Sequence, residues 1–237
     1  MKNLPFIRKD VVRVSPELVE RARQFQAAIL ADVGGRRGTL GGQIKPLHSS
    51  MKIAGPAFTV EVRPGDNLMF HVALAQARPG DVIVVEGKGD TSAALCGNIM
   101  VTQALAAGLE GFVVDACVRD SEEIVAGTFP VFSIGTNPNG PTKALGGRVN
   151  WPVTLAGTTV NPGDLIVGDA DRVVVVPKEN VEEILLLAQK KVEAEAKRIA
   201  AIQSGDLGAP WLQDTLIQAG VLTAGAELWA LASQRFW

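Results

Sequence analysis

Length, composition and charge limit the classes of protein to which this chain can belong. It has 237 residues, of which 47% are hydrophobic and 20% charged, and its formal net charge is −2. This composition is typical of a globular protein with one large domain, with or without appendages. The near-neutral charge provides no basic surface for nucleic acid or an anionic membrane, so neither is an expected partner. No apolar stretch reaches the length of a membrane span and no leader pattern opens the chain, which predicts a cytoplasmic protein.

The first half of the sequence predicts alternating helices and strands. Residues 16–31 have helical spacing and follow Ser15, a suitable N-cap, with Pro16 at the first helical position. A glycine-rich loop at 34–42 comes next. Beyond it we expect strands at 52–62, 81–87, 111–118 and 129–135, with helices at 68–77, 93–108 and 120–127. This order indicates an α/β core with at least partly parallel strand pairing.

The second half has a different pattern. Residues 149–177 contain one strand after another with turn signals between them and no helix, which predicts antiparallel pairing. A long helix is expected over 178–205, because acidic residues lie early in it, basic residues lie late, and glycine ends it. The predicted division of the chain is an N-terminal arm at 1–15, a main domain at 16–210, and a helical tail at 211–237 that packs on the domain or on a neighbouring subunit.

Most familiar catalytic motifs are absent from the sequence. There is no GxSxG elbow, Walker loop or HExxH, and no pair of Cys or His at metal-ligand spacing. Cys96 and Cys117 lie in apolar contexts and are expected to be buried free thiols. His48 is expected in an exposed loop, and His71, within an apolar helix, is expected to be a hydrogen-bonded structural residue. Carboxylate and arginine chemistry is what remains.

Residues 113–124, VVDACVRDSEEI, place two opposite charges directly after an apolar strand. Arg119 and Asp120 have two open interpretations: a solvated strand end that caps the next helix, or a pair that holds a charged ligand. Arginine can grip a carboxylate through two parallel hydrogen bonds, and aspartate can bind a hard divalent cation. An Arg-Asp dipeptide is usually structural, but sites in α/β proteins gather beyond the carboxyl ends of strands, so at this position the two interpretations are almost evenly matched.

The segment LCGNIM, upstream of this pair, carries a glycine at the start of a predicted helix. If the helix begins near Gly97, the amides of Ile99 and Met100 form an anion site at its N-terminus. The alternative is that the glycine only permits close helix packing. A tight turn joins this helix to the next strand, so Asn98 and Arg119 are expected to lie near one another.

Three long blocks then carry a family resemblance: GPAFTVEVRPGDNLMFHVALAQARPGDVIVVEGKGDTSAALCGNIM, GLEGFVVDACVRDSEEI, and NGPTKALGGRVNWPVTLAGTTVNPGDLIVGDADRVVVVP. From about residue 20 to 210 the chain resembles the RraA-like family. That family contains class II 4-hydroxy-4-methyl-2-oxoglutarate and 4-carboxy-4-hydroxy-2-oxoadipate aldolases and regulators of ribonuclease E activity. The resemblance implies a single α/β domain of the swivelling type, with three layers, β/β/α, an N-terminal helix and a C-terminal helical extension. It also implies a homotrimer or a hexamer with active sites between subunits.

The resemblance further implies roles for individual residues. The aldolases carry an acidic residue, twenty intervening residues and then Arg-Asp. By that match Arg119 would bind the pyruvate carboxylate and Asp120 would ligate Mg²⁺ or Mn²⁺. The backbone at Gly97, Ile99 and Met100 would hold the pyruvate moiety.

The implied site also includes two further carboxylates and one position at which this chain differs from the aldolase pattern. Asp32 and Glu195 match acids that the adjacent subunit of the aldolases places near the waters of the metal. Asn98 stands where the aldolases carry the acid, and an amide can hydrogen-bond such a water but cannot take its proton. The implied catalytic set is therefore Arg119, Asn98, Asp32 and Glu195. A smaller departure is Arg172, which stands in a turn where glycine is more usual.

The resemblance predicts a metal-dependent lyase that acts on a small 2-oxo acid. It would cleave a 4-hydroxy-2-oxo acid by a retro-aldol step that releases pyruvate, or decarboxylate oxaloacetate, in both cases through a metal-stabilised pyruvate enolate. Decarboxylation needs no base for a hydroxyl group, so the loss of the acid at position 98 should harm aldol cleavage more. The alternative is a non-catalytic, protein-binding oligomer like the ribonuclease regulators. Those lack the intact metal site, so the presence of Arg119 and Asp120 favours an enzyme.

Overall fold

The computed structural model describes residues 6–223 and 225. Its contacts divide the chain into two compact units, residues 1–192 and residues 193–237. Within the described ranges, no helix combines the length and the apolar character that crossing a membrane requires. The predicted tail at 211–237 lies partly outside the described residues, and its described part forms α7 (Leu212–Gln218). The packing partner predicted for this tail stays a prediction.

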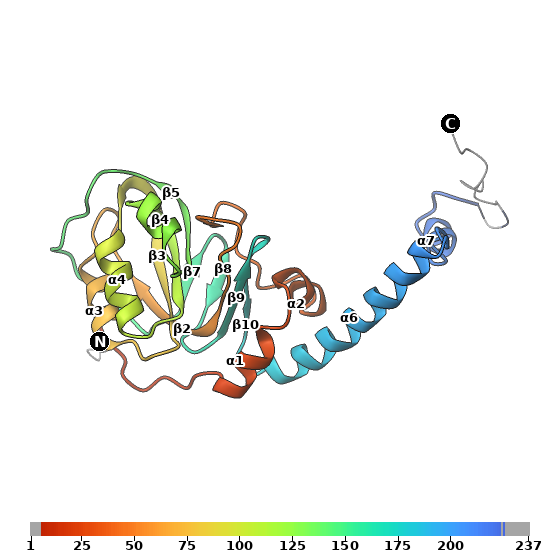
Figure 1. Cartoon of the computed structure of the whole chain (residues 1–237), viewed down its shortest axis with the longest axis horizontal. Helices are drawn as coiled ribbons and strands as arrows, with labels where there is room; N and C mark the ends of the chain where they lie inside the picture. The colour runs from red at the N-terminus through yellow and green to blue at the C-terminus, as the bar shows by residue number, and fades with distance from the viewer. Residues whose placement is uncertain (1–5, 224, 226–237) are drawn as a thin grey trace. The chain divides into compact units, whose positions relative to one another are not determined.

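One large sheet forms the centre of the first unit (Figure 1). Its strands follow the order β1-β5-β4-β3-β2-β9-β10, with β6 also paired to β2. Strands β2 to β5 pair in parallel, and β9 and β10 pair antiparallel, as the two halves of the sequence predict. A separate pair, β7 and β8, is also antiparallel. The strands are β1 (Lys45–Pro46), β2 (Ile53–Glu61), β3 (Val82–Ala94), β4 (Gly111–Val118), β5 (Val131–Thr136), β6 (Arg148–Val149), β7 (Val153–Leu155), β8 (Thr158–Val160), β9 (Leu165–Asp169) and β10 (Arg172–Val176).

Strand β2 joins the two halves of the sheet. Its first residues, 53–56, pair with β9, and its later residues, 57–61, pair with β3. All of β2 except its last residue is buried, as expected for a strand that is covered on both faces. The predicted mixed α/β domain is therefore confirmed.

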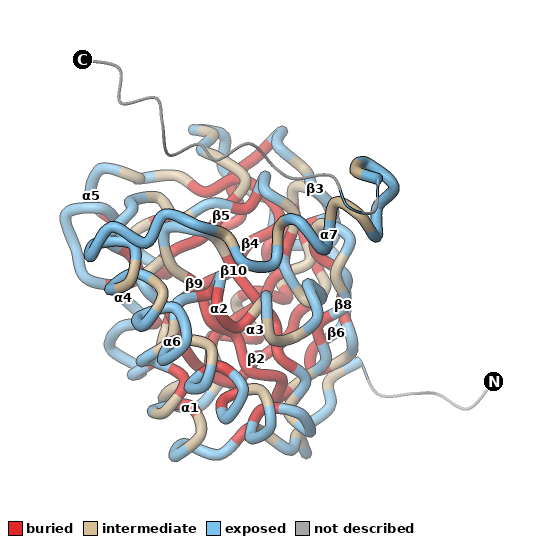
Figure 2. The backbone as a smooth tube through the Cα atoms, turned by 90° about the vertical axis from the view of Figure 1, so that its right-hand side faces the viewer, coloured by how far each residue is buried: buried red, intermediate tan, exposed pale blue. Residues whose placement is uncertain are grey.

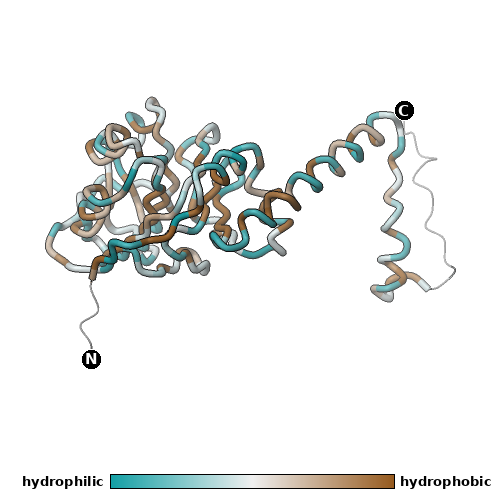
Figure 3. The backbone as a smooth tube through the Cα atoms, turned by 90° about the horizontal axis from the view of Figure 1, so that it is seen from below, coloured by the Kyte–Doolittle hydropathy of each residue, from teal (hydrophilic) through white to brown (hydrophobic). Residues whose placement is uncertain are grey.

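Helices cover the sheet and enclose two hydrophobic cores. The larger core includes Phe58, Phe70 and Phe112, and the smaller one includes Leu30 and Leu165. Buried backbone is concentrated along the strands (Figure 2). Hydrophobic and hydrophilic residues alternate along α6, as in an amphipathic helix (Figure 3). The helices of the first unit and the helix that continues from it are α1 (Pro16–Ala22), α2 (Ala27–Val33), α3 (Leu68–Gln76), α4 (Asn98–Ala106), α5 (Ser121–Ala126) and α6 (Val181–Gln203).

The predicted helix at 16–31 is wrong in one respect, because it is two helices. Ser15 caps α1 as expected, and its side chain accepts a hydrogen bond from the amide of Leu18. The chain then leaves the helical conformation at Gln26, and the amide of Ala27 donates to Asp169 Oδ2 at 2.9 Å. Asp169 ends β9, so a tertiary contact fixes where the second helix begins.

The predicted helix at 93–108 is also shorter in the structure. Strand β3 continues through two irregularities to Ala94, and α4 begins only at Asn98 with Gly97 as its N-cap. The intervening residues bond to the end of β4: Leu95 N donates to Cys117 O, and Arg119 N donates to Cys96 O, both at 2.9 Å. Pairing with β4 therefore replaces the first helical turns that the sequence pattern favours.

The described part of the predicted N-terminal arm runs along the domain. Arg8 N donates to Val149 O at 3.1 Å. The Arg13 guanidinium donates to both carboxylate oxygens of Asp81, at 2.7 and 2.8 Å. Asp81 is buried, and this hydrogen-bonded carboxylate raises the pKa of Arg13. The ion pair ties the arm to the start of β3.

Arg172 supplies a test of backbone strain in this fold. Its φ is 95°, a region that favours glycine. We expect Arg172→Gly to raise the free energy of unfolding by about 1 kcal/mol, because it relieves a strained backbone at one end of β10. Urea denaturation measures the change. Arg172→Ala is the matched control, since it removes the same hydrogen bonds to Gly42 O and Ala170 O but keeps the Cβ. An equal gain in both variants would contradict this explanation.

Candidate active site

The candidate site begins where the buried strand β4 ends. Every residue of β4 is buried, and Arg119 and Asp120 follow it directly. Their side chains are 42% and 38% exposed, so both charges reach the surface at the strand end. Because the segment before α4 is hydrogen-bonded to this same strand end, the first turn of α4 lies beside the two charged residues.

Asp120 adopts an uncommon backbone conformation. Its φ of 58° and ψ of 38° lie in the left-handed region, which aspartate tolerates better than most residues. It stands at the N-cap position of α5, yet its side chain makes no capping hydrogen bond there. Instead, its Oδ2 accepts a hydrogen bond from the amide of Asn98 at 2.9 Å and lies 3.9 Å from Arg119 Nε. The carboxylate is thus turned away from its own helix and toward α4.

Gly97 makes room for this carboxylate. A Cβ on Gly97 would lie 2.3 Å from Asp120 Oδ2 and 3.0 Å from Arg119 Cγ. The φ of Gly97 is −149°, an extended conformation that any residue can adopt. The close approach of the Arg-Asp pair, rather than backbone freedom or helix packing, is therefore the physical reason for a glycine at this position.

The first turn of α4 offers fewer free amides than the sequence predicts. Asn98 N is bonded to Asp120, and Met100 N donates to Gly97 O at 3.0 Å. Within the described residues, Ile99 N has no hydrogen-bond acceptor. The helix terminus therefore presents one amide, that of Ile99, to an anion.

A cavity of about 110 Å³ lies at this point. Five predicted site residues line it: Gly97, Ile99, Met100, Arg119 and Asp120. Asn98 reaches Asp120 through its main chain but does not line the cavity. The other lining residues, which the sequence pattern did not indicate as site residues, are Asn67, His71, Leu95, Cys96, Pro141 and Lys143.

The wall of the cavity that carries Lys143 is held in place by Asp66. This buried carboxylate accepts hydrogen bonds from Thr142 Oγ1 at 2.6 Å and from Ala144 N at 2.7 Å. Burial alone would raise the pKa of the Asp66 carboxyl, but these and other hydrogen bonds lower it. Asp66 thus fixes the two neighbours of Lys143 in the loop between β5 and β6.

His71 is not the hydrogen-bonded structural residue that the sequence predicts. It lies on α3 and lines the cavity, and its Nε2 is buried without a hydrogen-bond partner among the described residues. Asn67, one turn earlier, donates through its side-chain amide to Leu95 O at 2.8 Å, and its Oδ1 is also buried without a partner. Burial, followed by the charge of Lys143, lowers the pKa of His71. Two polar atoms on one wall therefore have unused hydrogen-bonding capacity.

The cysteines behave as predicted. Both are free and buried. Burial and then the charge of Asp120 raise the pKa of Cys96 to about 12, so this thiol stays protonated near neutral pH. Although Cys96 lines the cavity, it is not poised as a nucleophile or a thiolate ligand.

Asp32 and Glu195 do not line this cavity. Asp32 lies on α2, which packs against β10 at the other side of the domain from α4 (Figure 1), and its Oδ2 lies 3.0 Å from Lys191 Nζ. Glu195 belongs to the second compact unit. Across the described ranges, no group of three or more His, Cys, Asp or Glu could hold a metal ion. Of the residues lining the cavity, Asp120 is the one carboxylate.

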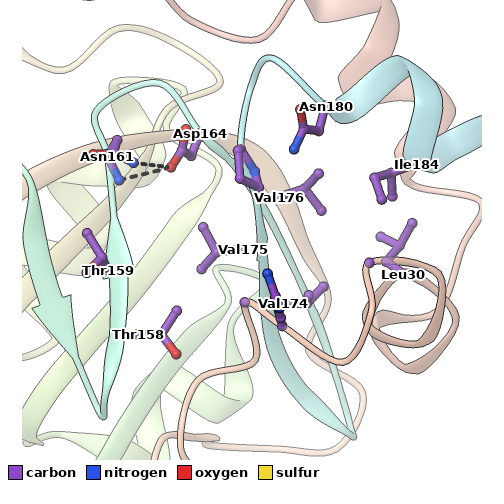
Figure 4. Close-up of a pocket in the computed structure, with 14 residues that line it drawn as sticks. Leu30, Thr158, Thr159, Asn161, Asp164, Val174, Val175, Val176, Asn180 and Ile184 are labelled. Atoms are coloured by element: carbon purple, nitrogen blue, oxygen red, sulfur yellow. Dashed lines mark hydrogen bonds between the residues drawn. The ribbon is translucent and has the colours of Figure 1, made fainter.

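A larger cavity, of about 390 Å³, lies between the two-stranded β7–β8 sheet, β10, α2 and α6 (Figure 4). Its wall combines aliphatic side chains such as Leu30 and Ile184 with polar ones, and none of the predicted site residues contributes to it. The Asp164 carboxylate at its edge already accepts hydrogen bonds from Asn161 N at 2.9 Å and Asn161 Nδ2 at 3.2 Å. This carboxylate closes a turn, and the predicted site residues line the smaller cavity instead.

Comparison with known proteins places the chain in a family. The family model described as "Aldolase/RraA" matches residues 15–175. A relative from Halalkalibacterium halodurans, named "Putative 4-hydroxy-4-methyl-2-oxoglutarate aldolase", is 39% identical over 186 residues, which cover 78% of this chain and 89% of that protein. Protein DlpA of Legionella pneumophila is 31% identical over 80% of this chain, but this match spans only 32% of DlpA.

Among solved structures, the chain is similar to RraAS2 of Streptomyces coelicolor, described as an unusual member of the RNase ES inhibitor RraA protein family. The TM-score is 0.73 at 29% sequence identity, and the match covers 80% of this chain and 98% of that one. The family match, the identity to the curated relative and this likeness agree. The chain belongs to the RraA-like, Aldolase/RraA family.

Proposed function

We propose that this protein is a divalent-metal-dependent carbon–carbon lyase. It cleaves a 4-hydroxy-2-oxo acid by a retro-aldol step that releases pyruvate, and it decarboxylates oxaloacetate through the same pyruvate enolate. One observation carries the proposal. Arg119, the amide of Ile99 and the Asp120 carboxylate converge on one cavity, although they come from two different segments. The aldolase name of the relative from Halalkalibacterium halodurans supports this class of reaction.

The residues at this cavity fit Mg²⁺ or Mn²⁺. Mg²⁺ prefers oxygen ligands, keeps several waters and commonly uses one or two carboxylates together with substrate oxygens. Asp120 supplies such a carboxylate: its Oδ2 is engaged by Asn98 N, and the group as a whole is 38% exposed. Asp120 would hold the ion, which when bound would act as a Lewis acid on the 2-oxo acid.

Side chains and backbone amides of this chain bind the substrate and stabilise the charge that develops on it. Arg119 offers its guanidinium to the 2-oxo acid end of the substrate, and the amide of Ile99 donates to the same anionic end. The hydrogen bond from Asn98 N keeps Asp120 oriented. Negative charge that moves onto the pyruvate half during bond cleavage is thereby met by donors already in position.

We further propose that the protein assembles as a homotrimer or a hexamer. In that arrangement Asp32 and Glu195 of one subunit approach the cavity of the next and bind waters there. Within one chain Asp32 is paired with Lys191 and does not line the cavity, which is consistent with a role at a neighbouring site.

A second candidate function is a protein-binding oligomer without catalytic activity. Two observations favour it: the likeness to RraAS2, and the amide at position 98 in place of an acid. The Arg119–Asp120 pair favours the lyase. Metal-dependent pyruvate release separates the two candidates.

Removal of the metal-binding carboxylate should abolish turnover. We expect Asp120→Asn to lower pyruvate release from 4-hydroxy-4-methyl-2-oxoglutarate by about a hundredfold or more, and a chelator to do the same to the unmodified protein. A coupled pyruvate assay with Mg²⁺, Mn²⁺ or no metal measures both effects. Glu122→Gln is the matched control, because it removes one exposed carboxylate two residues away that does not line the cavity. Undiminished turnover in Asp120→Asn would exclude the proposed metal site.

Restoring the acid at position 98 should favour the aldol reaction. Asn98→Asp adds a group that can accept a proton from a nearby water, so we expect aldol cleavage to rise about tenfold or more. Oxaloacetate decarboxylation, which needs no such base, should change much less. Parallel measurement of both turnovers on the same preparation checks the difference. If Asn98→Asp does not raise aldolase turnover when divalent metal is present, this explanation of the effect of Asn98 is refuted.

Filling the space at Gly97 should displace the carboxylate. Gly97→Ala places a Cβ where Asp120 Oδ2 lies, so we expect Mn²⁺ affinity and turnover to fall together by about tenfold or more. Calorimetric titration with Mn²⁺ measures the affinity. Gly146→Ala is the control, since a Cβ there would meet no atom within 4 Å. Normal Mn²⁺ affinity in Gly97→Ala would mean that the contact with Asp120 does not position a metal ligand.

A further inference from the structure

Aldol cleavage requires a proton acceptor that position 98 does not provide. The hydroxyl group on C4 of the substrate must lose its proton as the C3–C4 bond breaks. Asn98 cannot take a proton at neutral pH, and its side chain does not line the cavity. Of the remaining lining residues, Arg119 and Lys143 carry basic side chains that donate hydrogen bonds, Asp120 is the proposed metal ligand, and burial keeps the Cys96 thiol protonated. The acceptor must therefore be sought among the other polar groups of the cavity.

His71 has the geometry of such an acceptor. Its imidazole lines the same cavity as Arg119 and Asp120, and its buried Nε2 has no hydrogen-bond partner among the described residues. A buried polar nitrogen without a partner costs free energy, which a ligand hydroxyl group would recover by donating a hydrogen bond. His71 lies on α3, and Leu68, the first residue of this helix, donates its amide to Asp66 Oδ1 at 3.0 Å, which anchors the start of the helix.

Burial and one neighbouring cation favour the neutral form of the His71 imidazole, which can act as a base. Lys143 faces it from the loop after β5, Arg119 and Asp120 from the turn after β4, and Cys96 from the segment before α4. Burial, followed by the charge of Lys143, lowers the pKa of His71 below its ordinary value of 6.5. The ring is therefore neutral at neutral pH, the state in which it can accept a proton.

We infer that His71 is a catalytic residue of the lyase and accepts the proton of the substrate C4 hydroxyl group, the task for which position 98 lacks an acid. The inference rests on the proposed function. In the step, the hydroxyl proton moves to the imidazole, the C4 oxygen becomes a carbonyl oxygen, and the C3–C4 bond breaks. The electron pair of that bond forms the enolate of pyruvate. The imidazolium then returns the proton to C3, so pyruvate and a second carbonyl product leave with no change in oxidation state overall.

The two reactions of the proposed enzyme distinguish this role from substrate binding. Aldol cleavage needs the base, whereas oxaloacetate decarboxylation has no hydroxyl group to deprotonate. We expect His71→Gln to lower kcat for aldol cleavage about a hundredfold or more, while decarboxylation changes by less than about threefold. His48→Gln is the matched control, because it makes the same change at the other histidine, an exposed loop residue bonded to Ser50. Urea denaturation of both variants checks that each remains folded.

A double-mutant comparison sharpens the assignment. If Asn98→Asp supplies a second group that can accept the proton, His71→Gln should lower kcat for aldol cleavage by a smaller factor in the Asn98→Asp variant than in the unmodified chain. If His71→Gln lowers kcat by the same factor with Asn and with Asp at position 98, the two positions serve separate purposes, and this result would overturn the inference. Equal losses in aldol cleavage and decarboxylation would also overturn it, because they indicate a structural or binding role for His71.

The imidazole can also be observed without turnover. The chain has two histidines, so NMR titration of their ring signals, assigned with His71→Gln, follows His71 individually. We expect its pKa to lie below 6.5 and to rise in Lys143→Gln, which removes the neighbouring cation. In Lys143→Gln, the acidic limb of the pH profile of kcat/KM for aldol cleavage should shift to higher pH together with the pKa of His71. A limb that stays fixed while the pKa of His71 moves would overturn the inference. Absence of both activities from the unmodified protein would instead refute the proposed function itself.

Discussion

The hydrogen bond between the Asp120 carboxylate and the amide of Asn98 is the interaction on which the candidate site depends. A left-handed backbone costs free energy in a residue other than glycine, and Asp120 keeps it while leaving its own helix uncapped. The carboxylate therefore turns toward α4, and Gly97 lacks the Cβ that would block it. This one contact joins the exit of β4 to the start of α4, so the carboxylate proposed to bind a metal and the amide proposed to bind an anion belong to residues that line the same cavity.

A second constraint comes from the loop that closes the cavity. Asp66 is buried and accepts hydrogen bonds from the residues on either side of Lys143, so the stretch of backbone that carries this cation is held in position. The cavity then contains two cations, Arg119 and Lys143, against one carboxylate. Such a balance attracts an anionic ligand even before any metal contributes its charge. Burial and then the charge of Lys143 also lower the pKa of the neighbouring His71, which supports the catalytic role proposed for it.

The fold alone does not decide between catalysis and protein binding. Proteins similar to this chain carry the name of an aldolase in one case and of an RNase inhibitor family in another. Function therefore has to be argued from the side chains of the site. Here the arginine and the carboxylate proposed to bind the metal are present, while Asn98, twenty intervening residues before Arg119, stands where the resemblance implies an acid. Whether the protein can catalyse aldol cleavage therefore depends on whether another group of the cavity can accept the proton that an acid at position 98 would accept.

The sequence by itself determined the order of helices and strands, the exit of β4 at Arg119, and the family to which the chain belongs, because hydrophobic periodicity, turn residues and long motif blocks are local properties. The tertiary structure alone decided where helices break and which residues share the cavity. A hydrogen bond to Asp169 sets the first residue of α2, and pairing with the end of β4 makes α4 begin later than the sequence predicts. A hydrogen bond to Asp66 positions the loop that carries Lys143. The sequence predicts that His71 is a hydrogen-bonded structural residue because its helix is apolar. The structure shows that it lines the same cavity as the Arg-Asp pair and that its Nε2 has no hydrogen-bond partner in the described part of the chain. Contacts between segments distant in sequence leave no local pattern, so they could not be predicted from it.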